Sequence, residues 1–108
     1  MPEQYVSLIH IIQHPGNYHG KAVRVVGVAA FEFENKALYV GLDDFKNLVT
    51  KNAVWLDAKL TPELRALHSK YVLVEGVFDK DNLGHRSLFS GAFTSIKRLV
   101  RWVSRDEE

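Results

Sequence analysis

The stretch Gly20-Lys-Ala-Val-Arg-Val-Val-Gly27 has the composition of a β-strand that must bend. Valines dominate it, and it ends in a glycine, which allows a bend or a close approach of another backbone. The segment Lys70–Gly76 and, more faintly, Leu88–Phe93 repeat this pattern. Because bent strands let a short sheet curl and close, the pattern predicts a small sheet with few free edges. We expect Gly27 and Gly76 to lie at strand bends.

Five strands are expected along the chain. In the first, over residues 21–33, a period of two places Val23 and Val25 on one face and charged side chains on the other. Similar patterns predict strands over residues 37–40, 53–57, 71–78 and 88–98. The end of the last strand is ambiguous, because apolar residues from 96 to 103 also recur at helical spacing. Residues 97–108 can therefore be strand, helix or disordered.

Three helices complete the expected order. The first covers residues 3–14, where Tyr5, Leu8 and Ile12 share a face before Pro15-Gly16 ends the segment. A short helix begins at Asp43-Asp44, whose carboxylates favour a helix start. The third helix begins at Thr61-Pro62-Glu63, a typical N-cap followed by proline, and separates the third and fourth strands.

The sequence Gly20-Lys21-x-Val23-x-Val25-x-Gly27 resembles the opening strand of OB-fold domains, including the anticodon-binding-like and single-strand-binding branches. The resemblance covers residues 20–100 and agrees with the strand order above. It implies a mainly β fold, a five-stranded OB-like Greek-key barrel, with a ligand-binding face across the second and third strands. We expect one domain over residues 1–108, with the helix at 3–14, the barrel at 20–100 and a tail at 101–108.

Composition limits the possible functions. The chain has 108 residues, 46% of them hydrophobic, which is enough for one core. Fourteen basic and 13 acidic residues give a net charge of +1, unlike a strong nucleic-acid binder. The absence of cysteine excludes disulfides and thiolate metal sites. No apolar run approaches the ~20 residues that span a bilayer, and no signal peptide is recognisable, so we expect a cytoplasmic protein without membrane contact.

An acidic and aromatic face is predicted on the second and third strands. Alternation points Tyr39 and Trp55 outward, and Glu32, Glu34 and Asp57 share that side. Such a face repels phosphates and suits a basic patch on a protein partner. The first hypothesis is a non-enzymatic binding module, in its specific form an immunity-type inhibitor of a toxin enzyme that acts on nucleic acid or nucleotides. Alternatively, the two rings only cover the barrel against the N-terminal or the second predicted helix.

Weak binding of single-stranded DNA or RNA is the second hypothesis, as the OB-fold resemblance implies. Tyr39 and Trp55 would stack on bases, while basic residues near the C-terminus would follow the phosphates. The residues of this hypothesis are Arg24, Tyr39, Trp55, Lys97, Arg98, Arg101 and Trp102.

Metal binding and catalysis find little support in the sequence. His10 and His14 have a spacing that can bind zinc, with His19 nearby, but residues 11–13 supply no glutamate and no ligand set is complete. His85, in a loop, is a candidate contact or pH-sensitive residue. There is no nucleophile elbow and no phosphate-binding loop. We therefore expect no metal, no cofactor and no enzymatic activity.

Overall fold

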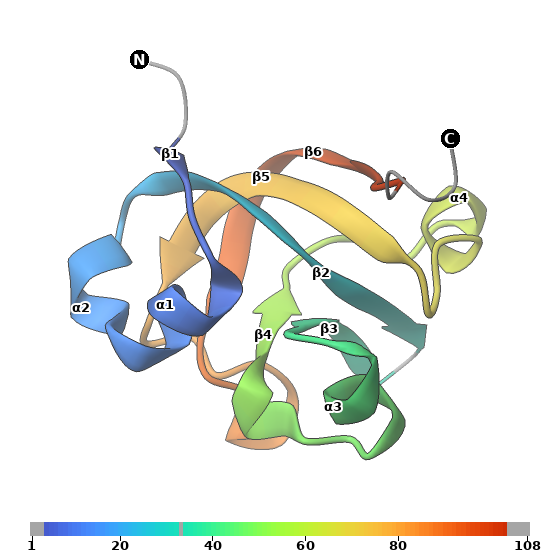
Figure 1. The fold of residues 1–108 in the computed structure, drawn as a ribbon, viewed down its shortest axis with the longest axis horizontal. Helices are drawn as coiled ribbons and strands as arrows, with labels where there is room; N and C mark the ends of the chain where they lie inside the picture. Colours follow the sequence, from blue (N-terminus) through green and yellow to red (C-terminus); the bar gives the residue numbers. More distant parts are fainter. Residues whose placement is uncertain (1–3, 33, 104–108) are drawn as a thin grey trace.

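Five principal strands form a mixed sheet in the computed structural model, which describes residues 4–32 and 34–103 (Figure 1). They are β2 (Ala22–Glu32), β3 (Asn35–Tyr39), β4 (Ala53–Leu56), β5 (Tyr71–Asp79) and β6 (Ala92–Arg101). A two-residue strand, β1 (Gln4–Tyr5), adds to β2 in parallel. The prediction of a mainly β chain with five principal strands is confirmed.

Each of the five strands pairs with two others. β2 is antiparallel to β3 and to β5, β3 is antiparallel to β4, and β5 is antiparallel to β6. β4 and β6 are parallel. β2 has room for two partners because it is long: residues 22–28 pair with β5, and residues 28–32 pair with β3. This strand therefore joins the part of the sheet that contains β3 to the part that contains β5.

Gly27 lies where β2 passes from one partner to the other. Its φ lies outside the left-handed region, so backbone strain does not require glycine here. A Cβ at this position would instead lie 2.6 Å from the carbonyl oxygen of Tyr39. At Gly76 a Cβ would lie 3.0 Å from the carbonyl oxygen of Thr94, opposite an irregularity in the pairing of β5 with β6. Both glycines thus permit a close approach of neighbouring strands.

The helices are short. They are α1 (Leu8–Gln13), α2 (Pro15–Tyr18), α3 (Leu42–Lys46) and α4 (Pro62–Arg65), with 3₁₀ turns η1 (Thr50–Asn52) and η2 (His85–Ser87). The predicted N-cap of α4 is confirmed, because Thr61 Oγ1 accepts a hydrogen bond from the backbone N–H of Leu64 at 3.2 Å. α4 lies between β4 and β5 in the chain, as expected.

Both ends of the predicted order need correction. The helix expected over residues 3–14 is too long: Gln4–Tyr5 pairs with β2 as a strand, and the helix begins only at Leu8, while residue 3 lies outside the described residues. The last strand begins at Ala92 rather than residue 88 and continues to Arg101. Pairing with β5 up to Arg101 satisfies the backbone there, so the helical alternative is wrong for this segment.

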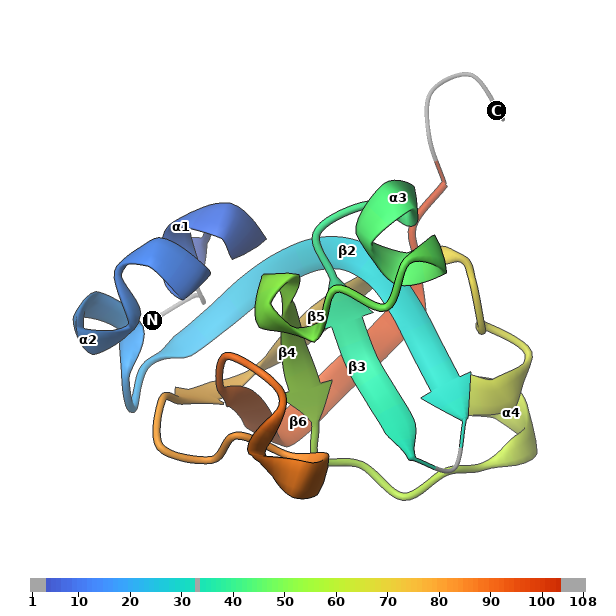
Figure 2. The ribbon, with the colours of Figure 1, turned by 90° about the horizontal axis from the view of Figure 1, so that it is seen from below.

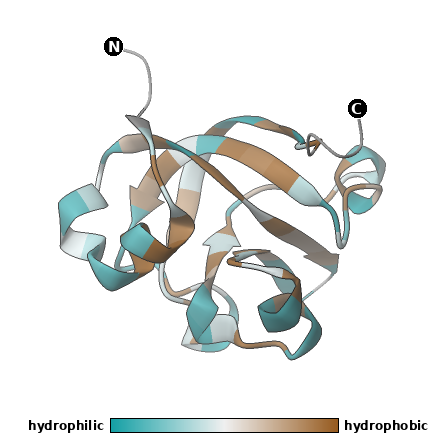
Figure 3. Cartoon of the chain, in the orientation of Figure 1, coloured by the Kyte–Doolittle hydropathy of each residue, from teal (hydrophilic) through white to brown (hydrophobic). Residues whose placement is uncertain are grey.

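The hydrophobic residues form two clusters. The larger one lies within the sheet and includes Ile11 of α1, which is fully buried. Figure 3 shows the matching hydrophobic colour along β2 and β5, while much of α2 and α3 is hydrophilic. The smaller cluster lies on the outer side of β2, β3 and β4, beneath α3 and the segment between β5 and β6 (Figure 2). Within the described residues, no helix is long and apolar enough to cross a membrane.

Candidate functional site

A surface pocket of about 780 Å³ opens beside the smaller cluster. Three segments frame it: the turn between β2 and β3, the chain between α3 and η1, and the loop between β5 and β6. Its lining residues are Glu32, Glu34, Asn35, Tyr39, Leu48, Thr50, His85, Arg86, Leu88 and Phe89. Pockets of this size and mixed polarity commonly hold a ligand or a side chain of a partner. We call this site the binding pocket.

Tyr39 forms part of the floor of the binding pocket. Its side chain is fully buried, and its ring packs edge-on against Phe45 of α3 with 5.9 Å between ring centroids. The hydroxyl donates a hydrogen bond to Asn35 Oδ1 at 3.0 Å. Burial raises the pKa of the Tyr39 hydroxyl, and the nearby negative charge of Glu32 raises it further. The hydroxyl is therefore a protonated donor over the neutral pH range.

The prediction that Tyr39 is displayed on an open face is wrong. Alternation places it on the outer side of the sheet, as expected, but α3 covers it. This agrees with the alternative prediction, in which the ring packs against the second predicted helix. Trp55 is half-buried on the same side. Its ring stacks on that of His85, with 6.4 Å between the ring centroids, and packs against Phe89, with 5.3 Å between the centroids. Lys36 Nζ lies 5.3 Å from the centre of the Trp55 ring. Neither ring is a free stacking platform for bases.

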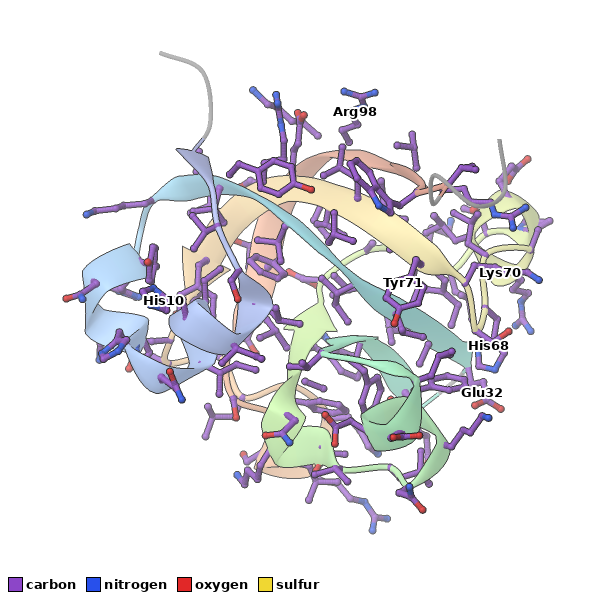
Figure 4. The ribbon with its side chains drawn as sticks, viewed as in Figure 1. His10, Glu32, His68, Lys70, Tyr71 and Arg98 are labelled. Carbon is purple, nitrogen blue, oxygen red and sulfur yellow. The ribbon has the colours of Figure 1, made fainter. Side chains whose placement is uncertain are left out.

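Two glutamates stand at the edge of the binding pocket, each beside a histidine. Glu32 Oε1 lies 3.8 Å from His68 Nε2, and Figure 4 shows these two side chains together at one end of the molecule. His68 Nδ1 accepts the backbone N–H of Phe31 at 3.0 Å, which fixes the position of the ring. Glu34 Oε2 lies 3.8 Å from His85 Nε2. The two glutamate side chains are 65% and 61% exposed, so both carboxylates are available to a partner.

The loop between β5 and β6 holds its pocket residues in an unusual backbone conformation. Arg86 and Ser87 have φ of 55° and 56°, in the left-handed region that non-glycine residues rarely adopt. Gly84 also has a positive φ, and a Cβ there would lie 2.7 Å from Trp55. Such conformations concentrate at functional sites. Sequence analysis flagged His85 in this loop but missed Arg86, because nothing in the sequence places it opposite the β2–β3 turn.

Asp57 does not join the other predicted partner-binding residues. β4 ends at Leu56, so the alternation on which the prediction depended stops one residue earlier. Asp57 lines a separate hollow of about 440 Å³ with Lys97 and Arg98. Of the five predicted residues, Glu32, Glu34 and Tyr39 line the binding pocket. Trp55 stacks on His85 in the β5–β6 loop, which borders the pocket.

The residues of the nucleic-acid hypothesis are divided between two regions of the outer surface of the sheet. Arg24, Arg98 and Trp102 lie in the region formed by β1, β2, β5 and β6, apart from Tyr39 and Trp55. Arg24 Nε donates to the buried Glu75 at 2.9 Å, and an Arg98 guanidinium nitrogen lies 3.5 Å from the same carboxylate. Arg98 is labelled on this side in Figure 4. Lys97 lines the smaller hollow, and Arg101 is exposed near the end of β6.

Exposed aromatic rings accompany these arginines. Tyr5 is 55% exposed and Trp102 is 41% exposed, with 6.4 Å between their ring centroids. Tyr71, also exposed, accepts a backbone hydrogen bond from Trp102 at 2.9 Å. We call this surface, made of Tyr5, Arg24, Tyr71, Glu75, Arg98 and Trp102, the arginine face. Sequence analysis missed Tyr5, which it assigned to a helix, and Tyr71.

The histidines near the N-terminus lie apart from the binding pocket. His10 and His14 contact each other at 5.4 Å between ring centroids. The ligand atoms of His19, Asp79 and Asp81 all lie within 4.8 Å of one another, a grouping that sequence analysis missed because the aspartates are far away in sequence. His19 Nδ1 accepts the backbone N–H of Lys80 at 3.1 Å, which explains the position of its ring without a metal.

Comparisons with protein-family models, with curated proteins and with solved structures gave no significant match.

Proposed function

We propose that the chain is a non-enzymatic binding module of the OB-fold type. The strand pairings support this assignment, because five strands with two neighbours each and a parallel contact between β4 and β6 are compatible with a small Greek-key barrel. The position of α4 between β4 and β5 and the opening sequence of β2 agree with it. In such a barrel the outer side of β2, β3 and β4, where the binding pocket lies, is the ligand-binding side.

The partner in this proposal is a protein with a basic patch. The observation that carries it is the pair of exposed carboxylates, Glu32 and Glu34, at the edge of a pocket with an aromatic floor. Carboxylates repel a phosphate backbone and attract lysine and arginine side chains. Leu48 and Leu88, 62% and 44% exposed beside the same pocket, add apolar contact area. In its specific form, the module covers the cationic active site of a toxin enzyme, as an immunity protein does.

Retention of a protein partner from the native source tests this proposal. The full chain would be immobilised as wild type, as the double variant Glu32→Gln/Glu34→Gln, and as Glu63→Gln, a control on an exposed residue of α4. We expect a basic protein to be retained in equimolar amount by wild type and control, and to be lost with the double variant. The proposal would be contradicted if the double variant retained the partner as well as the wild type does, or if no protein were retained.

Inhibition is tested on the same retained protein. If the specific form is correct, the partner hydrolyses nucleic acid or a nucleotide when free, and equimolar wild-type chain suppresses that activity. The double variant should need a much higher concentration. A partner that is fully active in the complex would leave a binding module without the inhibitor role.

A second candidate function is weak binding of single-stranded nucleic acid on the arginine face. The observation that favours it is the exposure of Tyr5 and Trp102 beside Arg24 and Arg98. It differs from the initial hypothesis, since Tyr39 and Trp55 take no part. Affinity for labelled oligonucleotides should then fall steeply between about 50 and 200 mM salt, and Trp102→Ala should weaken it more than Trp55→Ala. No salt-dependent binding would exclude this function.

A further inference from the structure

Three rows of side chains cross the outward surface of β2, β5 and β6, on the arginine face. The strand register sets them side by side: Tyr5, Arg24, Glu75 and Arg98 in the first row, Val26, Leu73 and Val100 in the second, and Tyr71 and Trp102 in the third. Residues that alternate with them, such as Val25 and Val74, belong to the larger cluster, so the rows point outward. The charged row therefore lies beside apolar and aromatic side chains.

The charged row places two guanidinium groups on a single carboxylate oxygen. Arg24 Nε donates to Glu75 Oε1 at 2.9 Å, and Arg98 Nη1 lies 3.5 Å from the same oxygen. The Glu75 side chain is only 7% exposed, whereas those of Arg24 and Arg98 are 35% and 53% exposed. Figure 4 shows Arg98 extending away from the sheet. Two positive charges thus face one negative charge, and solvent reaches the positive ones.

A second anion on the solvent side would balance the charge of this row. A guanidinium has five N–H donors, so one contact of each arginine with Glu75 leaves donors on both for another acceptor. Because both arginines contact the same oxygen atom, they lie close enough together to share one ligand. The planar fork of arginine matches the oxygens of a phosphate group in particular.

The aromatic side chains of the arginine face indicate what accompanies the phosphate. Tyr5 and Trp102 are 55% and 41% exposed, and their ring centroids lie 6.4 Å apart. Exposed rings stack on nucleobases of any sequence, and each such contact strengthens binding. The carboxylate of an acidic peptide brings no base to these rings. The arginine face therefore favours a phosphate group that carries a base.

We propose that Arg24 and Arg98 together hold one phosphate group of a single-stranded nucleic acid, while an adjacent base stacks on Trp102. This step rests on the second candidate function and names its phosphate contact. Glu75 has two roles: it fixes both guanidinium groups, and its negative charge opposes the incoming phosphate and keeps binding weak. Removal of that charge should therefore strengthen binding, which a purely structural ion pair does not predict.

NMR on the full chain tests the contact, because the Nε–H groups of arginine side chains give signals of their own. Inorganic phosphate, thymidine monophosphate, a thymidylate oligomer and acetate would be titrated separately at about 50 mM salt. We expect the signals of Arg24 and Arg98 to shift with phosphate and with the nucleotide, and the nucleotide to bind at least about fivefold tighter through stacking. No shift of these signals, or equal affinities for acetate and phosphate, would overturn the proposal.

Single substitutions separate binding from folding. Arg98→Gln should lower the nucleotide affinity about tenfold, whereas Arg65→Gln, at an exposed arginine of α4, should leave it unchanged. Glu75→Gln keeps an acceptor for Arg24 but removes the charge, and it should raise the nucleotide affinity about threefold. Trp102→Ala should weaken binding of the nucleotide but not of inorganic phosphate. Unchanged affinity in Arg98→Gln, or weaker binding by folded Glu75→Gln, would overturn the proposal; if Glu75→Gln does not fold, Arg98→Gln decides.

The phosphate contact and the second candidate function fail in different ways. If the oligomer binds with steep salt dependence but Arg98→Gln binds it as the wild type does, the phosphate contact is wrong and the nucleic-acid function stands. If phosphate and nucleotide bind through the two arginines but the oligomer binds no tighter than the nucleotide, the phosphate site stands and the nucleic-acid function is what fails.

Discussion

In one region of the outer surface of the sheet, Tyr39 and Trp55 lie beneath α3 and the β5–β6 loop, whereas in another region Tyr5 and Trp102 remain exposed. The charges are arranged in the opposite way. Glu32 and Glu34 of the binding pocket are largely exposed, but the carboxylate of the arginine face is buried between two guanidinium groups. In the pocket the rings are packed and the carboxylates are exposed, whereas on the arginine face the rings are exposed and the carboxylate is buried.

This difference matters for function because exposed charges, rather than paired ones, attract a partner over distance. Glu75 offsets much of the positive charge of Arg24 and Arg98. Glu32 and Glu34 each lie 3.8 Å from a histidine nitrogen, and their side chains stay 65% and 61% exposed. The contrast explains why we place the protein contact at the pocket and only a weak second function on the arginine face.

Gly27→Val should have the largest effect, because this glycine lies in β2, the strand that both regions share. A Cβ would lie 2.6 Å from the Tyr39 carbonyl oxygen and 2.7 Å from Leu38 Cγ. We expect a loss of about 3 kcal/mol in the free energy of unfolding, measured in urea. The control is Gly16→Ala in α2, where no atom lies within 4 Å of the added Cβ. Similar midpoints for the two variants would show that β2 yields easily at residue 27.

Replacing the two tryptophans separately tests the contrast between packed and exposed rings. Trp55→Ala removes contacts with His85 and Phe89 and should cost about 2–3 kcal/mol. Trp102→Ala should cost less than about 0.5 kcal/mol, because its ring is 41% exposed and away from the core. Thermal or urea unfolding provides the comparison. Equal losses would mean that the arginine face is also a packing surface.

The ion pair between Arg24 and Glu75 on the arginine face should contribute less to the free energy of unfolding than the contacts of Trp55. Arg24→Met leaves the carboxylate of Glu75 buried with only the longer Arg98 contact, and we expect a loss of about 1.5 kcal/mol. In a Glu75→Gln background the same replacement should cost little, so a double-mutant cycle isolates the pair. Additive losses would indicate that Arg24 acts through packing of its stem rather than its charge.

Periodicity in the sequence was enough to predict the strands and much less informative about what covers them. Valines at positions 23 and 25 identify the inner side of β2, and alternation correctly assigns Tyr39 to the outer side. Whether an outer ring is exposed depends on α3 and on a loop near residue 85, both placed by tertiary contacts. The position of Glu75 beside Arg24, 51 residues away, depends on the same long-range pairing.

The candidate site was predicted only in part, because part of it depends on long-range contacts that periodicity does not reveal. Glu32 and Glu34 belong to a local turn whose geometry follows from the two strands that it joins. Asp57 was assigned to the same surface by extending the alternation of β4 past its last residue. Arg86 could not be found, because its position depends on left-handed backbone at residues for which the sequence gives no glycine.

The smallest expected effect is the dependence of stability on alkaline pH, which tests the burial of Tyr39 directly. Burial raises the pKa of its hydroxyl above that in the unfolded chain. The corresponding stability is present below the unfolded value near 10 and is lost as pH rises through the folded value. Wild type should therefore lose unfolding free energy more steeply above pH 10 than Tyr39→Phe, in urea titrations at fixed ionic strength. Tyr71→Phe, on the arginine face, should follow the wild type; if it flattens the curve as much as Tyr39→Phe does, the two regions do not differ in how they cover their rings.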